Sequence, residues 1–588
     1  MENKYNTLLN VLDGICKEAP EDFKSYHDLG SKQKLVNARS KAFIHLLLKA
    51  RFGILKFSER EKLITDGPHD GGIDAYFIDK ENKKIYFIQS KFRSTRDNFD
   101  NKAISADDLI KMELKNITEG KFFDSKGDEF NSKIKDFIKE LSGLENHARY
   151  KFQVIFLGNL QNYSGEQIRR LTEGFEYEIY NFERTYKELM YSICSGIHHK
   201  PDDIYITLGL SNKINPLLTQ TINTKQGKFD VWITFIPVRE IGRIMTQYKN
   251  SLLRYNPRNY LTLSDNPVNK KISESITKQK ENDFAILNNG LTLLANFFNF
   301  SQGTGKQNRG EIVMSNPQII NGGQTAYTLG SIYENYKDDL ENTFGDKEVL
   351  IKAIVAEDVD SLDPEFINSI SNATNQQTRV NEADRRANDE IQIRIQKLIF
   401  DEFGYYYERK KGEFYPGISL GYIDKGLIIK RDNFLRSYYA SRGFPGHARS
   451  AGSDALFSEN KFREIMDDPK NFKKMFFAYL IHKNLSGRKK ENWGYGVRYG
   501  KFSIVYSIML NFDPESLSNE EYEIKANEKI EKIQKNWKEF EDFIREKDSN
   551  KYYLSDDGDF DFDGYYKGKN VANDIGEFFE KNKENDKE

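Results

Sequence analysis

The sequence predicts a multidomain α/β protein whose carboxy-terminal part is mainly helical, and three observations lead to this fold class. The chain has 588 residues, which is more than one hydrophobic core usually holds. Helical and strand-like segments alternate up to about residue 412, with a change of pattern near residue 197. Beyond residue 412 the pattern is chiefly helical. We therefore predict domains at 1–197, 198–412 and 413–588.

The first domain begins with a helical region and continues with a β-hairpin. Residues 1–56 place apolar side chains near a 3.6-residue period, as helices do. Two runs rich in β-branched and aromatic residues, 73–79 and 85–92, flank a polar stretch and predict the hairpin. The later elements are a helical region at 105–145, a strand from Lys151, a helix from Ser164 and a strand from Phe175.

The second domain is expected to mix strands and helices in a different order. A helix is predicted from Val238 to Leu253, where the apolar positions recur at helical spacing. Strand-like runs begin at Ile204, Phe229, Leu291 and Glu348.

The third domain contains a long charged helix with one apolar stripe. The stripe has 3–4–3–4 spacing, which places its members on one face. Packing against the domain's own core is the favoured interpretation, and the seam of a homodimer is the alternative. The stripe consists of Ile530, Ile533, Trp537, Phe540 and Ile544.

Composition limits the classes of protein to consider. The formal net charge is −2, so any nucleic acid has to be held by local basic patches. The two cysteines, Cys16 and Cys194, are far apart and form no metal-binding or disulfide pattern, which fits a reducing cytoplasm. No secretion signal is expected, and the apolar stretch Ala42–Phe57 is too short and too charged to span a bilayer. We expect a cytoplasmic protein without a membrane partner.

The hairpin carries the candidate catalytic residues Asp74, Gln89 and Lys91. Gln89 and Lys91 are two residues apart on one strand, so their side chains leave the same face. An even-numbered loop would place Asp74 on that face as well. Carboxylate and amide oxygens suit a hard cation such as Mg²⁺ or Mn²⁺. Lys91 could then orient the attacking water or offset charge on a phosphate.

The surrounding residues strengthen this prediction without deciding it. Gly71 and Gly72 allow close backbone approach, and Asp66 and Asp70 add acidic groups. From spacing alone, an ordinary edge hairpin with polar residues on its wet face explains the pattern equally well. Arg93 and Arg96 follow the hairpin and could neutralise phosphates near the metal.

The central region offers a second candidate site, built from amides and glycines. A two-glycine loop before a helix can cradle an anion on its backbone amides, although a tight turn with a good cap explains it too. Nearby amide side chains suit base edges or a nucleotide. The loop is Asn321-Gly322-Gly323-Gln324-Thr325, and the other amides are Asn288, Asn289, Asn375 and Gln377.

A basic and aromatic segment follows these amides. Tyr405-Tyr-Tyr-Glu is continued by Arg409 and Lys410, so rings and cations interleave. This composition suits single-stranded nucleic acid, and a solvated face is the alternative.

Two resemblances extend these interpretations. Asp74 with Gln89-Ser-Lys91 resembles the core of the PD-(D/E)xK nucleases, in the variant with Gln for the second acid. The Asn-Asn-Gly, Asn-Gly-Gly-Gln-Thr and Asn375-Gln-Gln377-Thr blocks resemble the abortive-infection phage-resistance (AIPR) family. The resemblance implies a PD-(D/E)xK-like core at 1–197 and a central AIPR region.

The implied function is metal-dependent cleavage of nucleic acid in bacterial phage defence, with DNA expected rather than RNA. Asp74, Gln89 and Asp66 would hold the metal, and Lys91 would assist the attacking water. The superfamily often has a Glu on the preceding helix, but residues 33–51 contain no acid. Asp66, at the end of a strand expected at 59–66, is our candidate replacement. Two alternatives stay open, a non-cleaving sensor with a degenerate nuclease fold and an oligomeric scaffold.

Overall fold

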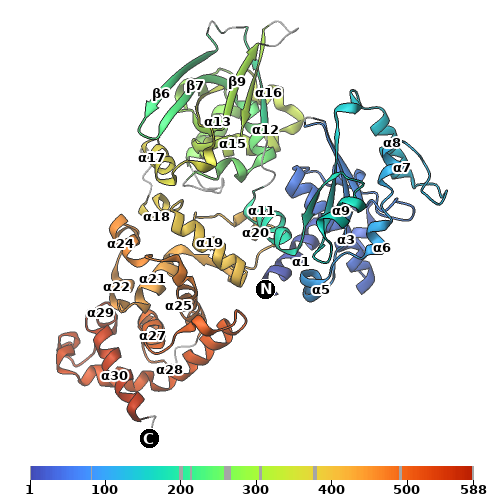
Figure 1. The fold of residues 1–588 in the computed structure, drawn as a ribbon. Coiled ribbons are helices and arrows are strands. Elements are labelled where there is room, and N and C mark those ends of the chain that lie inside the picture. The colour runs from blue at the N-terminus through green and yellow to red at the C-terminus, as the bar shows by residue number, and fades with distance from the viewer. Residues whose placement is uncertain are drawn as a thin grey trace.

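The computed structural model shows three bodies joined near their middle (Figure 1). A mixed α/β fold with several sheets confirms the predicted multidomain α/β class. The structure describes residues 2–80, 82–197, 203–211, 213, 215–256, 267–302, 308–374, 381–488 and 493–585. Within this part of the chain, no helix is both long and apolar enough to cross a membrane.

The amino-terminal body contains a four-stranded sheet in the order β1-β2-β3-β4. The hairpin strands β1 and β2 are antiparallel, whereas β2, β3 and β4 run parallel. The predicted hairpin and both later strands are therefore confirmed. The strands are β1 (Ala75–Asp79), β2 (Lys84–Ser90), β3 (Lys151–Leu157) and β4 (Glu176–Tyr180).

Helices cover both faces of this sheet, so its central strands are buried. One face packs on α1 (Glu2–Lys17) and α3 (Lys32–Phe52). The other face packs on α8 (Ser132–Ser142), with α9 (Gly165–Leu171) alongside. The helix expected across 105–145 is broken into α6 (Ala106–Ile110), α7 (Leu114–Thr118) and α8. Gly120 and Gly127, both at positive φ, lie in the turns that separate α7 from α8.

The central body contains two sheets with a shared core. A three-stranded antiparallel sheet has the order β5-β10-β9, and a five-stranded mixed sheet has the order β11-β8-β12-β7-β6. The strands are β5 (Asp203–Gly209), β6 (Leu217–Thr224), β7 (Gly227–Pro237), β8 (Leu291–Ala295), β9 (Phe297–Gln302), β10 (Arg309–Ser315), β11 (Gln318–Asn321) and β12 (Glu348–Val355).

Two helices of the central body matter for the sites below. Helix α12 (Val238–Tyr248) packs along α15 (Gly323–Asn335), and both contribute to the core shared by the two sheets. Helix α13 (Pro267–Thr277) joins the same core, and α17 (Pro364–Thr374) covers the opposite face of the larger sheet.

The carboxy-terminal body is helical except for β14 (Ile428–Lys430), which pairs with β13 (Tyr406–Glu408). Its core already includes residues of α18 (Glu382–Arg385) and α19 (Glu390–Phe403), before the predicted limit at residue 412. The stripe of α28 (Glu521–Glu546) packs into this core, as the favoured interpretation predicted. The other main helices are α21 (Arg431–Ser441), α25 (Phe472–Leu485), α27 (Lys501–Met509) and α30 (Val571–Asn585).

The bodies are held together by chain segments that are distant in sequence. Phe400, Tyr406 and Phe414 pack into the core of the amino-terminal body. The ammonium of Lys4 donates to the carbonyl oxygen of Asp401 at 2.9 Å. The short helices α11 (Tyr191–Ser195) and α20 (Tyr415–Ser419) lie between the amino-terminal and central bodies (Figure 1).

Candidate metal centre

The loop that leads into β1, residues 66–74, brings three carboxylates together, and we call it the acidic loop. One oxygen each from Asp66, Asp70 and Asp74 lies within 4.8 Å of the others. Asp66 is exposed, and Asp70 and Asp74 are partly buried. Carboxylates this close repel one another unless a proton or a cation neutralises them. The cluster therefore has the composition and the spacing of a site for a hard divalent cation.

Glycines give the loop its close-packed path. Gly71 and Gly72 have φ of +63° and +69°, a region that favours glycine. A Cβ on Gly72 would lie 2.6 Å from the carbonyl oxygen of Lys111, so no side chain fits there. The backbone amides of Gly67 and Gly72 donate to the Asp70 carboxylate at 3.1 and 2.9 Å. The loop is thus folded tightly around one of its own acids.

Neighbouring elements hold the loop from outside. The side-chain amide of Asn131 donates to the carbonyl oxygen of Thr65 at 3.1 Å, and its backbone amide donates to His69 at 2.9 Å. The amide of Glu113 donates to the carbonyl oxygen of Gly71 at 2.8 Å. These partners lie at the start of α8 and of α7. The helices therefore hold the backbone of the loop in place, and with it the carboxylates.

Strand alternation brings Gln89 to the same side of the sheet. Ile85 of β2 packs in the core under α8, so Gln89 and Lys91 share that face. Tyr76 of β1 packs in the same core, which puts Asp74 there as well. The amide of Ser90, next to Gln89, donates to the Asp74 carboxylate at 2.6 Å. Asp74 and Gln89 therefore lie side by side.

Gln89 contains an unusual polar atom. Its side chain is only 7% exposed, and among the described residues nothing donates a hydrogen bond to its Oε1. A buried acceptor without a partner costs about 1–3 kcal/mol. An oxygen of this kind is available as a ligand, and the neighbouring carboxylates supply further oxygens. The residues present therefore fit Mg²⁺ or Mn²⁺.

Lys91 is held by a partner that the sequence did not indicate. Its Nζ lies 2.9 Å from a carboxylate oxygen of Asp108 on α6. Burial alone would raise the pKa of Asp108, but hydrogen bonds from Lys91 and Ser105 lower it below its usual value. The positive charge of Lys91 also acts on Asp74 and opposes the rise in its pKa. Lys91 therefore stands beside the acidic loop with its ammonium fixed.

The pKa values of the two partly buried acids, Asp70 and Asp74, are raised. Burial raises the pKa of Asp74 well above its usual value, against the hydrogen bond from Ser90, and the charges of Asp66 and Asp70 raise it further. Burial also raises the pKa of Asp70, while the amides of Gly67 and Gly72 oppose the rise. Without a cation, the carboxyls share an electrostatic conflict that binding of one would relieve.

The predicted strand at 59–66 is wrong. Residues Phe57–Lys62 form helix α4, and only Ile64 makes a bridge to Ala75. Lys56 starts this helix without a side-chain cap, and the buried Phe57 and Arg60 hold it on α3, where Arg60 Nε donates to His45 at 3.1 Å. Asp66 nevertheless lies beside Asp74, as a consequence of the turn after α4.

The two basic residues after the hairpin differ in what they contact. Arg93 donates to the carbonyl oxygen of Ala103 at 3.1 Å, so it mainly supports the chain between α5 (Arg96–Asn101) and α6. Arg96 lies 3.1 Å from Asp97 and 3.5 Å from Glu520, and its side chain is 33% exposed.

The central amide loop is largely satisfied by its own groups. The backbone amide of Gly322 donates to Oδ1 of Asn321 at 2.7 Å. Asn288 donates to Thr325 Oγ1 at 3.2 Å and accepts from the amide of Gly290 at 2.9 Å. Asn289 is exposed and Gln324 is partly buried, whereas Asn375 and Gln377 lie outside the described residues. The glycines start α15 next to β8, so the loop has a clear structural role.

The prediction that the Tyr405–Lys410 segment binds single strands is wrong for its two cations. Arg409 is 9% exposed and donates to Gln396, Ala387 and Glu413. Lys410 is 2% exposed and donates to the carbonyl oxygens of Leu253 and Arg254. Burial lowers the pKa of Lys410 to about 7. Lys410 thus ties the segment to the central body, whereas Arg409 is bonded to groups at residues 387–413, and neither buried cation has a surface for nucleic acid.

The family of the chain follows from its second half. A family profile described as AIPR protein matches residues 253–572, which is more than half of the chain. The chain belongs to the AIPR family. The matched region contains the Asn-Gly-Gly-Gln loop and most of the carboxy-terminal body, and it excludes the acidic loop. Neither a curated protein nor a solved structure matches the chain significantly.

Membership in the family connects the chain with abortive infection, the defence in which an infected cell limits phage growth. The match begins after the first domain, so it says nothing of the chemistry at Asp74. The geometry of the acidic loop is therefore the basis for any catalytic assignment.

Proposed function

We propose that this AIPR protein is a metal-dependent nuclease of phage defence, and that the acidic loop is its catalytic centre. Asp66, Asp70, Asp74 and Gln89 would hold Mg²⁺ or Mn²⁺. The single observation that carries the proposal is the buried Oε1 of Gln89, which has no hydrogen-bond partner among the described residues and belongs to the strand residue next to Asp74 and its two neighbouring acids. Such an atom is expected where a ligand completes the site.

The roles of the chain's own residues follow from their contacts. A bound divalent cation would polarise a phosphodiester and its attacking water. Lys91, whose Nζ lies 2.9 Å from the Asp108 carboxylate, is suited to stabilising negative charge on the phosphate. Arg96, partly exposed at the start of α5, is placed to contact the backbone of a nucleic acid, with DNA as the expected substrate.

The fold order supports the proposal as well. A hairpin, two further parallel strands and helices on both faces make the arrangement that PD-(D/E)xK-like cores use. A cytoplasmic site of action agrees with the reduced, buried cysteines Cys16 and Cys194.

A non-cleaving sensor of nucleic acid is the second candidate, and one observation favours it. Helix α3 contains no acid, so the ligand that many related nucleases take from this helix is missing. In this alternative the acidic loop would bind a cation or a phosphate-bound cation without turnover.

Cleavage of supercoiled plasmid, linear DNA and RNA by the purified full chain tests the proposal. We expect Mg²⁺- or Mn²⁺-dependent cleavage that EDTA abolishes and that Asp74→Asn reduces at least about a hundredfold. Asp136→Asn, an exposed acid on α8 of the same body, is the matched control and should cleave normally. Binding without cleavage by the wild type would support the sensor, and cleavage that survives Asp74→Asn would contradict both roles for the loop.

A further inference from the structure

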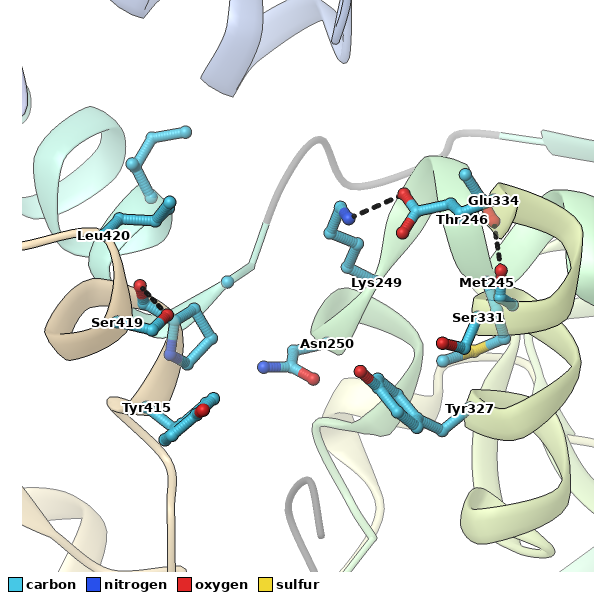
Figure 2. A pocket seen from close by; sticks show the side chains of 14 residues that line it. Met245, Thr246, Lys249, Asn250, Tyr327, Ser331, Glu334, Tyr415, Ser419 and Leu420 are labelled. Atoms are coloured by element: carbon cyan, nitrogen blue, oxygen red, sulfur yellow. Dashed lines mark hydrogen bonds and ion pairs between the residues drawn. The ribbon is translucent and has the colours of Figure 1, made fainter. Parts of the chain in front are cut away.

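A cavity of about 250 Å³ lies between the amino-terminal and central bodies, and the acidic loop contributes nothing to it (Figure 2). Its walls come from four segments that are far apart in sequence: the end of α11, the end of α12 with the following turn, α15 and α20. Helix α15 is the one that begins at the Asn-Gly-Gly-Gln loop. A ligand here would touch both bodies at once.

Two aromatic rings face the cavity from opposite sides. Tyr327 belongs to α15 and Tyr415 to α20, and Figure 2 shows Asn250 between them. Met245 and Ile193 add apolar surface. Aromatic and aliphatic walls with a few polar groups are typical of sites for planar organic ligands.

The charged groups at the rim indicate a neutral ligand. Lys249 Nζ lies 3.3 Å from Glu334 Oε1, and both side chains are partly exposed. Glu334 would repel an anionic ligand and Lys249 would repel a cationic one, so the ion pair favours neither sign of charge. Hydroxyl groups can donate to Glu334 and accept from Lys249 together. A ring carrying a neutral polyol meets all of these conditions.

The backbone at the rim is held in a rare conformation. Lys249 has φ of +46° and ψ of −129°, which is uncommon for a residue with a side chain. Its amide donates to the carbonyl oxygen of Met245 at 2.9 Å, and Asn250 Nδ2 donates to Ser195 at 2.8 Å. Strained backbone persists where the surroundings fix it, often at ligand sites. The cavity wall is therefore preformed.

We propose that this cavity binds one nucleoside, with the base against the Asn250 amide and the tyrosine rings that flank it, Tyr327 and Tyr415, and the ribose hydroxyls at the Lys249–Glu334 pair. The volume is below the ~300–1,000 Å³ of pockets for drug-sized ligands, which suits one nucleoside rather than a dinucleotide. Because the walls belong to both bodies, the bound nucleoside would hold the amino-terminal body and the AIPR region in one arrangement. Occupancy requires neither a metal nor cleavage.

Isothermal titration of the full chain with adenosine, guanosine, cytidine and uridine tests this inference. At least one nucleoside should bind, and its 5′-monophosphate should bind at least about tenfold more weakly because of Glu334. Tyr415→Ala should weaken binding about tenfold, a size typical of losing one aromatic stack, while Tyr415→Phe should retain it. Tyr336→Ala, an exposed tyrosine at the end of α15 and outside the cavity, should change nothing.

Three results would overturn the inference. They are no binding of any of the four nucleosides, equal or tighter binding of the monophosphate, and unchanged affinity in both Tyr415→Ala and Tyr327→Ala. If an alanine variant fails to fold, Ser331→Phe gives the same information, because a ring on this half-buried helical position fills the cavity. A folded Ser331→Phe protein that binds normally would contradict the site.

Discussion

The acidic loop and the Asn-Gly-Gly-Gln loop have similar backbones, but they differ in how far their polar groups are bonded within the protein. Both use glycines at positive φ beside a strand, and both gather polar side chains. In the central loop, Asn321 and Asn288 are bonded to groups of the loop and its neighbours. In the acidic loop three carboxylates lie close together, and on the neighbouring strand β2 the Oε1 of Gln89 has no hydrogen-bond partner among the described residues.

This difference separates a chemical site from a folding element. A polar cluster that satisfies itself gains stability and has little capacity left for a ligand. A cluster that keeps like charges and an unpaired buried acceptor has a reason to bind something else. The family motif of the central body therefore has a structural role at the start of α15, whereas the residues around Asp74 have the composition that the proposed metal site requires.

The largest effect is expected at Lys91. Lys91→Ala should lower metal-dependent cleavage about 10²–10³-fold, because a fixed positive charge near the phosphate is lost. The melting temperature should change little, since Lys91 is a partly exposed side chain whose loss opens no core. The cleavage rate and the melting temperature of the variant and the wild type are measured in parallel, and protection from phage is a second readout. Full activity of this variant would remove Lys91 from the catalytic centre.

Gly322→Ala tests whether the Asn-Gly-Gly-Gln loop is a tightly packed folding element. We expect a loss of about 2–5 kcal/mol in the free energy of unfolding of the central body, from a positive φ and a Cβ 2.5 Å from Leu291 Cδ2. Gly174→Ala has the same φ of +84° but open space around the new Cβ, so it should cost only about 1 kcal/mol. Denaturant unfolding measures both. Equal costs would show that the loop is not tightly packed.

Arg409, a buried cation of the Tyr405–Lys410 segment, should contribute to stability and not to the binding of nucleic acid. Arg409→Ala should destabilise the protein by about 3–5 kcal/mol, because the buried Glu413 carboxylate loses the guanidinium that pairs with its charge. Arg96→Ala should leave stability nearly unchanged and reduce the salt dependence of DNA binding by about one charge. Filter binding at several salt concentrations, with a melt of each variant, compares the two. The reverse pattern would restore the Tyr405–Lys410 segment as a binding surface.

The smallest effect is expected at Gln324. Gln324→Ala should leave Mn²⁺ binding at the acidic loop unchanged, since the side chain belongs to α15 of the central body. If the central amides form a ligand site, as the sequence predicted, Gln324→Ala should weaken only binding or activation by nucleic acid; if the loop is a folding element alone, neither should change. A parallel titration of Gln324→Ala, Asp74→Asn and the wild type with Mn²⁺ decides this, and a Gln324→Ala protein that loses the metal would link the two loops directly.

Local pattern was sufficient to predict the hairpin and its shared face. Alternation along β2 fixes Gln89 and Lys91 on one side, and the turn before β1 carries Asp66 and Asp74 whatever its detailed path. The amphipathic stripe of α28 was equally readable, because its period is set by helix geometry alone.

Contacts between distant segments could not be predicted in the same way. Asp108 reaches Lys91 from a five-residue helix in a region where the sequence suggested one long helix. Lys410 is buried by carbonyl groups of residues 253 and 254, more than 150 positions earlier in the chain. Interleaved rings and cations look alike on a solvated strand and at a docked interface, so the composition of Tyr405–Lys410 did not distinguish them.

A Mn²⁺ titration followed by electron paramagnetic resonance tests the central claim, that the acidic loop is a cation site, most directly. The wild type should bind Mn²⁺, and Asp74→Asn should weaken that binding at least about tenfold, since a carboxylate ligand is lost while the fold keeps its shape. Asp136→Asn, with an equal change of charge on α8, should bind like the wild type. No binding by the wild type, or equal binding by Asp74→Asn, would contradict the account.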